Sequence, residues 1–150
     1  DGASVPSNYS YRRNEMADVV TSQTIQDGAR HVVMSFTNVS DGSGEAAVKK
    51  VDVSALESDP ISGSACSTVA IQSVWFSTLG MSVKLLWDAS TDVLALHLPA
   101  DYSDTLDMSE FSGLNNNSGS GVTGDIMFTT VGHSSGDAYT VVLKMVKHYS

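Results

Sequence analysis

The chain is poor in positive charge. Its 150 residues contain 8 Lys and Arg against 17 Asp and Glu, and the formal net charge is −9. Because neutralisation of phosphates by basic side chains dominates nucleic-acid affinity, this balance argues against DNA or RNA as a partner. The sequence also lacks any run of 18 apolar residues, so we expect no membrane-spanning helix and no membrane partner.

Cysteine is nearly absent as well. Cys66 is the sole cysteine, which excludes an intrachain disulfide. It stands in S-A-C-S-T at the start of an apolar stretch, and we expect it to be a buried small side chain. A nucleophile or an intermolecular bridge would need a partner group that the sequence does not show.

The sequence is rich in apolar/polar alternation with a period of two residues. This pattern is typical of strands that have one face on a core. It predicts eight strands, at about 16–26, 30–40, 46–56, 67–79, 81–88, 92–98, 124–131 and 137–148. Short turns rich in Gly, Asp and Ser separate most of them, which favours antiparallel neighbours. We therefore predict an all-β fold over residues 16–150: a single antiparallel β-sandwich or barrel of about eight strands, jelly-roll-like.

Two segments do not share this pattern. Residues 1–15 show no core periodicity and predict an extended N-terminal arm, with a disordered tail as the alternative. Residues 99–123 predict a long loop, and loops of this length are often functional. Residues 104–111 in that loop could form a turn or two of helix.

The 99–123 loop carries acidic residues at every third position. On a short helix these side chains would share one face and could attract a cation, but a solvated acidic loop is the simpler interpretation. The four histidines of the chain are scattered without metal-ligand spacing. We therefore expect no cofactor, and the weak candidates for a metal site are Asp101, Asp104, Asp107 and Glu110.

The stretch G-H-S-S-G-D over residues 132–137 crowds together the side chains of a nucleophilic triad: His133, Ser134, Ser135 and Asp137. Its first five residues match the G-x-S-x-G elbow literally. That elbow joins a parallel strand to a helix, whereas a strand pattern follows here. We interpret the stretch as a β-hairpin turn, and we expect no catalytic residues and no enzymatic activity.

The two tryptophans fall on apolar faces of predicted strands. Trp75 has the parity of Ile71 and Leu79, and Trp87 has the parity of Val83 and Leu85, which favours core or interface positions over a sugar-binding platform. Apolar residues also occur on the opposite faces of these strands. In a protein of this size, a strand that is apolar on both faces indicates a subunit interface, so we predict a homo-oligomer.

The N-terminal arm adds a second candidate interface. Tyr9, Tyr11, Arg12 and Arg13 cluster there in a chain with few basic residues. Tyr and Arg are enriched at interface hot spots, and an extended arm can add main-chain hydrogen bonds to the sheet edge of a neighbour. We predict these four residues as contact residues.

Three segments of the chain resemble small virion proteins of marine tailed bacteriophages. They are R-H-V-V-M-S-F-T-N-V-S-D-G-S-G-E (30–45), V-K-L-L-W-D-A-S (83–90) and G-D-I-M-F-T-T-V-G-H-S-S-G-D-A-Y-T-V-V-L-K-M (124–145). The resemblance spans most of residues 30–147 and implies a β-rich, non-enzymatic structural component of the particle.

Within that group, the expected function is that of a capsid decoration (cement) protein, which binds the phage shell in many copies and stabilises it. The partners would then be the major capsid protein and copies of the chain itself, and the location would be the capsid surface. The alternative is a phage tail, fibre or lectin-like binding module that uses the acidic 99–123 loop.

Overall fold

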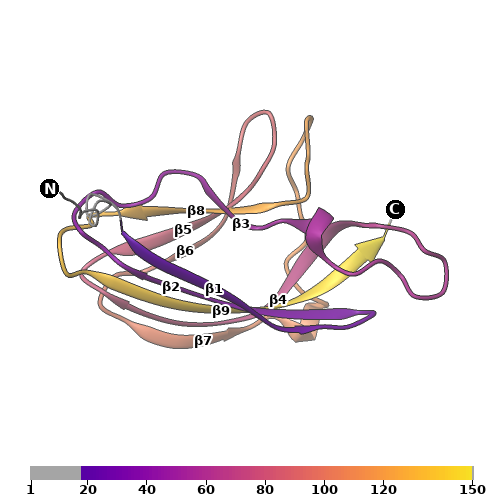
Figure 1. The fold of residues 1–150 in the computed structure, drawn as a ribbon, viewed down its shortest axis with the longest axis horizontal. Helices are drawn as coiled ribbons and strands as arrows, with labels where there is room; N and C mark the ends of the chain where they lie inside the picture. The colour runs from indigo at the N-terminus through magenta and orange to yellow at the C-terminus, as the bar shows by residue number, and fades with distance from the viewer. Residues whose placement is uncertain (1–17, 150) are drawn as a thin grey trace, which may run out of the picture.

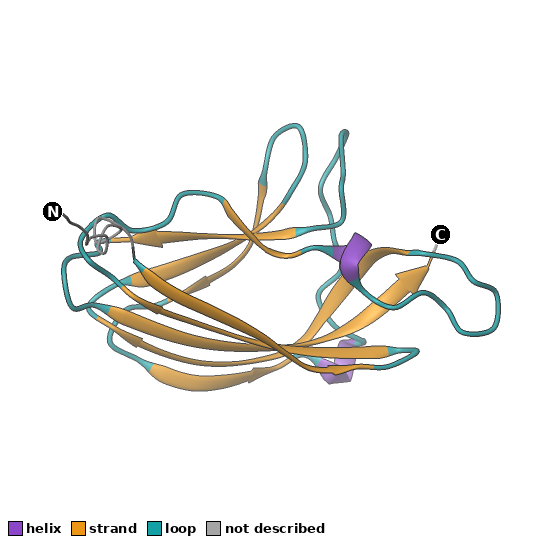
Figure 2. Cartoon of the chain, in the orientation of Figure 1, coloured by secondary structure: helices purple, strands orange, loops and turns teal. Residues whose placement is uncertain are grey.

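The part of the chain that the structure describes has nine strands, which form two antiparallel sheets that pack face to face (Figures 1 and 2). The computed structural model describes residues 18–149. Its strands are β1 (Val19–Asp27), β2 (His31–Val39), β3 (Val48–Val51), β4 (Cys66–Leu79), β5 (Ser82–Trp87), β6 (Val93–Leu98), β7 (Ser103–Asp107), β8 (Ile126–Val131) and β9 (Ala138–Tyr149). Two short 3₁₀ helices, η2 (Val53–Ala55) and η3 (Ser109–Phe111), lie in connections. Neither of them has the length or apolar character needed to cross a membrane.

The strand order is that of a jelly roll with one strand added. The five-stranded sheet has the order β1-β2-β9-β4-β7, and the four-stranded sheet has the order β3-β8-β5-β6. Strands β2–β9, β3–β8, β4–β7 and β5–β6 pair as four nested antiparallel pairs. Contacts of β9 with β4 and of β8 with β5 join these pairs into two sheets. The prediction of a jelly-roll-like sandwich is therefore confirmed, and β1 is an extra edge strand.

Several tight turns cross from one sheet to the other. Strands β8 and β9 lie in different sheets, so the 132–137 connection is not a hairpin, contrary to the prediction. The turn at Gly80 likewise joins β4 to β5 across the sandwich. Alternation predicts where strands lie in the sequence, but it does not predict which sheet each strand joins. Strands of both sheets turn an apolar face to the core, so their sequence patterns are alike.

The 99–123 segment is more ordered than the predicted loop. It contains β7, which pairs with β4, and η3, and Leu114 forms an isolated bridge to Ile71. Strand β7 reads S-D-T-L-D, and Asp is depleted in strands, so its sequence gives little strand signal. Main-chain hydrogen bonding to β4 at the edge of the sheet therefore decides its conformation.

The core lies between the two sheets and is built by the predicted alternation. Residues Met81, Val83, Leu85 and Trp87 are at most 1% exposed, as expected from their shared parity. Rings from both sheets meet edge to face: the centroids of Phe36 and Phe128 are 5.2 Å apart. Such aromatic pairs contribute about 0.5–1.5 kcal/mol beyond the area they bury.

Cys66 is also buried, as predicted, and it forms no disulfide. Burial raises the pKa of its thiol above the ordinary value. A thiol held protonated in this way is a poor nucleophile, which agrees with a packing role.

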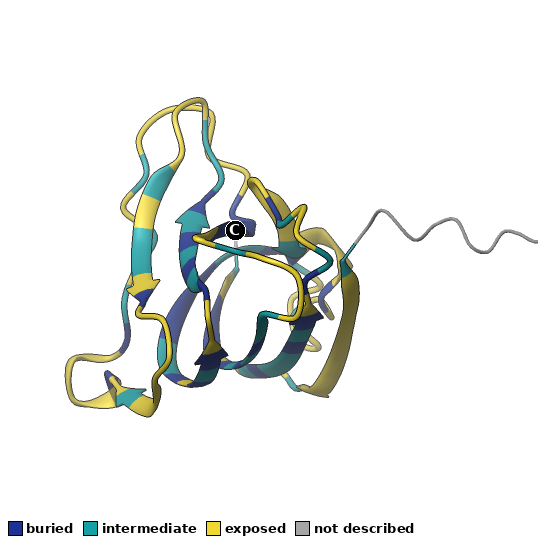
Figure 3. Ribbon diagram, turned by 90° about the vertical axis from the view of Figure 1, so that its left-hand side faces the viewer, coloured by how far each residue is buried: buried dark blue, intermediate teal, exposed yellow. Residues whose placement is uncertain are grey.

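Trp75 is not in the core, which was one of the two positions that parity favoured. Strand β4 contains a β-bulge, because Ile71 pairs with Met145 and Ser73 with the adjacent Lys144. Gln72 is therefore an extra residue that reverses the parity of the rest of the strand. Beyond the bulge Phe76 turns into the core, while Trp75 points to solvent and is 48% exposed. Figure 3 shows the resulting mixture of exposed and buried positions along the strands.

Candidate functional site

The outer face of the five-stranded sheet has three consecutive cross-strand rows without a charged side chain. The rows are Val19–Val39–Ala138–Leu79, then Thr21–Thr37–Thr140–Ser77–Ser103, then Gln23–Ser35–Val142–Trp75–Thr105. None of these residues is buried, whereas the positions that alternate with them on β2, β4 and β9 are buried. We call this set of three rows the uncharged face.

The apolar part of the uncharged face lies in its outer two rows. Val19 is 67% exposed, Val39 51% and Leu79 61%, and these three side chains line one end of the sheet. Trp75 lies in the third row, between Val142 and Thr105 on the neighbouring strands. Large apolar side chains gathered on one solvent-facing surface mark an interaction site more often than scattered ones do.

The middle row consists of hydroxyl residues on all five strands. Thr21 and Thr37 hydrogen-bond to each other through their hydroxyls, and the Ser103 hydroxyl donates to Ser77 Oγ at 2.9 Å. These cross-strand bonds hold the side chains in defined positions. The row is therefore polar but neutral, and it separates the two apolar rows.

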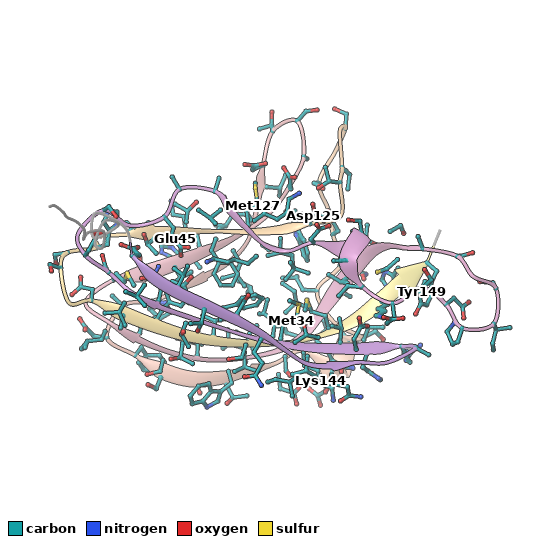
Figure 4. All side chains as sticks on the ribbon, in the orientation of Figure 1. Met34, Glu45, Asp125, Met127, Lys144 and Tyr149 are labelled. Carbon is teal, nitrogen blue, oxygen red and sulfur yellow. The ribbon has the colours of Figure 1, made fainter. Side chains whose placement is uncertain are left out.

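Charge returns at the next row, where Lys144 and Asp107 flank Ser73. Figure 4 shows Lys144 on the outer side of the five-stranded sheet. The hydroxyl of Ser109, with a further contribution from the positive charge of Lys144, lowers the pKa of Asp107 below its ordinary value. The uncharged face thus has a definite boundary.

Asp18 fixes the point at which the chain enters the uncharged face. Its carboxylate accepts hydrogen bonds from Asn38 Nδ2 at 3.0 Å, from the Asp41 amide at 3.1 Å and from Ser43 Oγ at 3.1 Å. Partial burial alone would raise the pKa of Asp18, but these hydrogen bonds outweigh it and lower the pKa. The predicted contact residues precede this point and lie outside the described residues: Tyr9, Tyr11, Arg12 and Arg13.

A buried polar cluster lies behind this end of the face. Glu45 pairs with Lys50 at 2.6 Å and accepts a hydrogen bond from the Tyr139 hydroxyl at 2.6 Å. The Glu45 and Lys50 side chains are only 6% and 8% exposed, and Figure 4 shows Glu45 at the end of the sandwich near the N-terminus. Burial, followed by the hydrogen bond to Glu45, raises the pKa of Tyr139. The cluster joins β3, β9 and the β2–β3 connection, and its groups satisfy one another.

The triad-like stretch does not have the geometry of a triad. The amide and the hydroxyl of Ser134 donate to Asp137 Oδ2 at 2.8 and 3.0 Å, while His133 Nδ1 lies 3.1 Å from Thr130 Oγ1. A triad needs its nucleophile bonded to the histidine. Among residues 18–149 no hydrogen bond joins His133 to Ser134 or Ser135. The observed contacts are those of a turn that connects the two sheets.

The four acidic candidates do not converge on a point. Asp104 and Asp107 lie on β7 rather than on a helix, and their odd separation turns them to opposite faces of the strand. Asp101 instead accepts a hydrogen bond from the Gly80 amide at 2.7 Å. Across the described part of the chain, no group of three or more His, Cys, Asp or Glu side chains is placed to hold a metal ion.

A shallow hollow of about 220 Å³ lies at the other end of the sandwich. It is lined by Asp27, Gly28, Ala29, Glu57, Ser58 and Pro60. The buried Lys147 ammonium pairs with Asp27 and donates to the Glu57 carbonyl at 3.0 Å. These contacts pair the charges of Lys147 and Asp27, and they tie β9 to β1 and to the β3–β4 connection.

No protein-family model matches the chain, and comparison with curated proteins finds no match. Parity favoured core or interface positions for Trp75, and apolar residues on both faces of the strands predicted a second buried face, but sequence reasoning named only the four residues of the arm as contacts and did not identify the rows of the uncharged face. The sequence does show that alternate positions of β1, β2, β4 and β9 lack charge. Only the cross-strand register shows that these positions lie side by side on one surface.

Proposed function

We propose that the chain is a non-enzymatic virion structural protein, a capsid decoration (cement) protein that binds the phage shell in many copies and stabilises it. The observation that carries this proposal is the uncharged face. Charged residues make up 17% of the chain and its net charge is −9, yet the fourteen residues of the three rows, four in the first and five in each of the others, include none. Depletion of charge and enrichment of aromatic residues distinguish the centres of protein interfaces from other surface.

The rigidity of this face favours binding. Its side chains stand on five strands that are hydrogen-bonded to one another, so little backbone ordering has to accompany association. Trp75 lies within the face and has the character of a hot-spot anchor. The jelly roll occurs in viral capsid, lectin and cupin domains, and it accommodates the proposed role without selecting it.

The size of the uncharged face suits a protein that binds a lattice in many copies. With strands about 4.8 Å apart and rows about 6.8 Å apart, five strands and three rows cover roughly 24 by 20 Å, or about 500 Å². A standard stable interface uses about 800 Å² on each partner. One copy would therefore bind weakly, and many copies on a regular lattice, where each can contact its neighbours, would gain from multivalency.

The first test is to locate the chain in the phage particle whose genome encodes it, by cryo-electron microscopy. Hundreds of copies at regular shell positions, with the uncharged face against the major capsid protein, would support the proposal. A few copies at a tail or vertex, or none in the particle, would refute it.

A binding assay then tests the face itself. Purified chain should co-sediment with undecorated shells, and Trp75→Ala should weaken that binding at least about tenfold, because the exposed half of the indole would be desolvated on docking. Ile61→Ala is the matched control, since Ile61 is 95% exposed on the β3–β4 connection, away from the face. Equal binding by the two variants would contradict the assignment of the face.

A lectin-like binding module is the second candidate, and exposed Trp75 is the observation that favours it. An indole flanked by Thr105 and by Ser73 and Ser77 on its own strand offers a stacking surface and neutral hydrogen-bond partners to a saccharide. The 99–123 segment would then contribute through Thr105 of β7 and not through a cluster of carboxylates. Quenching of Trp75 fluorescence by neutral oligosaccharides at submillimolar concentration, without shell binding, would favour this candidate over the first.

A further inference from the structure

Strand β1 is a long and highly exposed edge strand of the five-stranded sheet. Eight of its nine residues are exposed, on both sides of the strand. Val20, on the side that faces the sandwich interior, is 45% exposed, and Ile25 is 55% exposed. The four-stranded sheet therefore does not cover β1, which projects beyond the jelly roll, and within residues 18–149 β1 pairs with β2 alone.

The free edge of β1 differs from the other three sheet edges. Natural proteins protect edge strands by making them short, by placing charges on them or by bulging them. Strand β7 has five residues and carries Asp104 and Asp107, and β3 has four residues and carries Lys49 and Lys50. Strand β6 is interrupted in the middle, where its pairing skips a residue between Leu94 and Leu96.

Strand β1 has none of these protections along most of its length. It has nine residues, V-V-T-S-Q-T-I-Q-D, without proline and without charge before the final Asp27. Its bulge, at Ile25, leaves Val19–Thr24 as a regular run of six residues. Long, neutral, exposed edges rich in β-branched residues are templates for pairing with another strand.

We propose that β1 pairs antiparallel with β1 of a second copy of this chain across a two-fold axis, so that two five-stranded sheets become one continuous sheet. Antiparallel pairing of identical strands is self-complementary, as a two-fold interface requires. A two-fold axis perpendicular to the sheet leaves the outer faces of both copies on the same side, so residues opposite each other must share parity. An axis at Ser22 meets this condition within the regular run: it sets Ser22 opposite the partner's Ser22 and Val20 opposite the partner's Thr24. Asp27 of each copy then lies beyond the paired run.

Charge favours a second copy at this edge. Each chain carries a net charge of −9, so two copies repel wherever acidic residues meet. Pairing through β7 would bring Asp104 and Asp107 of both copies into one contact, and the juxtaposition of like charges opposes association. The β1 run brings the chains together with no charge at the contact. The proposed dimer is inferred from β1 alone and does not depend on the proposed virion role. If the chain has that role, the dimer would present two adjacent uncharged faces to the shell.

Sedimentation equilibrium of the full chain tests the proposal. We expect a species of twice the 15.8 kDa chain mass. Ser22→Lys should weaken dimerisation at least about tenfold, because the two lysines would lie directly opposite each other at the axis. Thr105→Lys makes the same change of charge on β7 and should leave the dimer intact. Circular dichroism melting of each variant establishes that it is folded.

A charge-swap pair separates loss of pairing from loss of folding. Ser22→Lys and Ser22→Glu should each be monomeric, and an equimolar mixture of the two should form a heterodimer. Oxidative cross-linking locates the contact: in a Cys66→Ser background, cysteine at Ser22 should link two copies, and cysteine at Ser103 on β7 should not. A monomeric wild-type chain at 100 micromolar or above, a dimer that tolerates Ser22→Lys, or a dimer lost in Thr105→Lys would each overturn the proposal.

Discussion

Replacing Lys50 by methionine should destabilise the protein through the carboxylate that it leaves behind. Glu45 Oε2 lies 2.6 Å from Lys50 Nζ, and both side chains are less than 10% exposed. Removing one partner of a buried ion pair costs about 3–5 kcal/mol, because the other charge stays buried without compensation. Glu45 retains the hydrogen bond from the Tyr139 hydroxyl, so we expect a loss near the lower limit, about 3 kcal/mol.

Urea unfolding at pH 7 measures this loss directly. The midpoint should fall while the dependence of the unfolding free energy on urea stays unchanged. Lys84→Met is the matched control on the outer face of β5, and it should change stability by less than about 0.5 kcal/mol. Replacing the whole cluster, with Glu45→Met, Lys50→Met and Tyr139→Phe together, should recover most of the lost stability, because no unpaired polar group then remains buried. A loss below about 1 kcal/mol in Lys50→Met would refute the reasoning, since it would mean that Glu45 reaches water.

Three further predictions follow from single residues. Because the native Tyr139 hydroxyl has a raised pKa, its contribution to stability is intact below pH 10 and is lost as the pH rises, by up to about 1.4 kcal/mol per pH unit. Urea unfolding at pH 9–11 should show that Tyr139→Phe removes this pH dependence of the unfolding free energy. An equal pH dependence in the variant and the wild type would contradict the prediction. Gly124→Ala should lower the free energy of unfolding by about 2–4 kcal/mol, because Gly124 has φ +89° and a Cβ there would lie 1.9 Å from the Ser67 carbonyl oxygen. Thermal unfolding measures this loss, and wild-type stability in the variant would contradict the geometry. Acrylamide should strongly quench the fluorescence of Trp75 and only weakly quench that of Trp87, which is 1% exposed. The fluorescence of a Trp75→Phe variant should therefore resist quenching, and quenching equal to that of the wild type would contradict the bulge.

Alternation located most of the strands because one face of each strand has to meet the core. The pattern at 81–88 became β5, and the pattern at 137–148 became β9, each within one residue of the predicted start. Strand β7 was missed because an edge strand on the solvent side needs little apolar content and is held by main-chain hydrogen bonds to β4.

The direction of Trp75 shows why local parity was insufficient for the candidate site. One extra residue, Gln72, reverses every side chain after it, and its presence depends on how β4 pairs with β9. The same register brings Thr21, Thr140 and Ser103 into one row, although they are far apart in the chain.

The sequence by itself determined the fold class, the acidic balance and the alternation that separates core from surface, because these follow from composition and from the two-residue period of a strand. Only the tertiary structure decided which strands share a sheet, that β1 stands at an uncovered edge, and that an uncharged face with Trp75 exists. Those features arise from pairing between distant strands, and the pairing energy of each strand depends on the partner and the register that the whole sandwich selects.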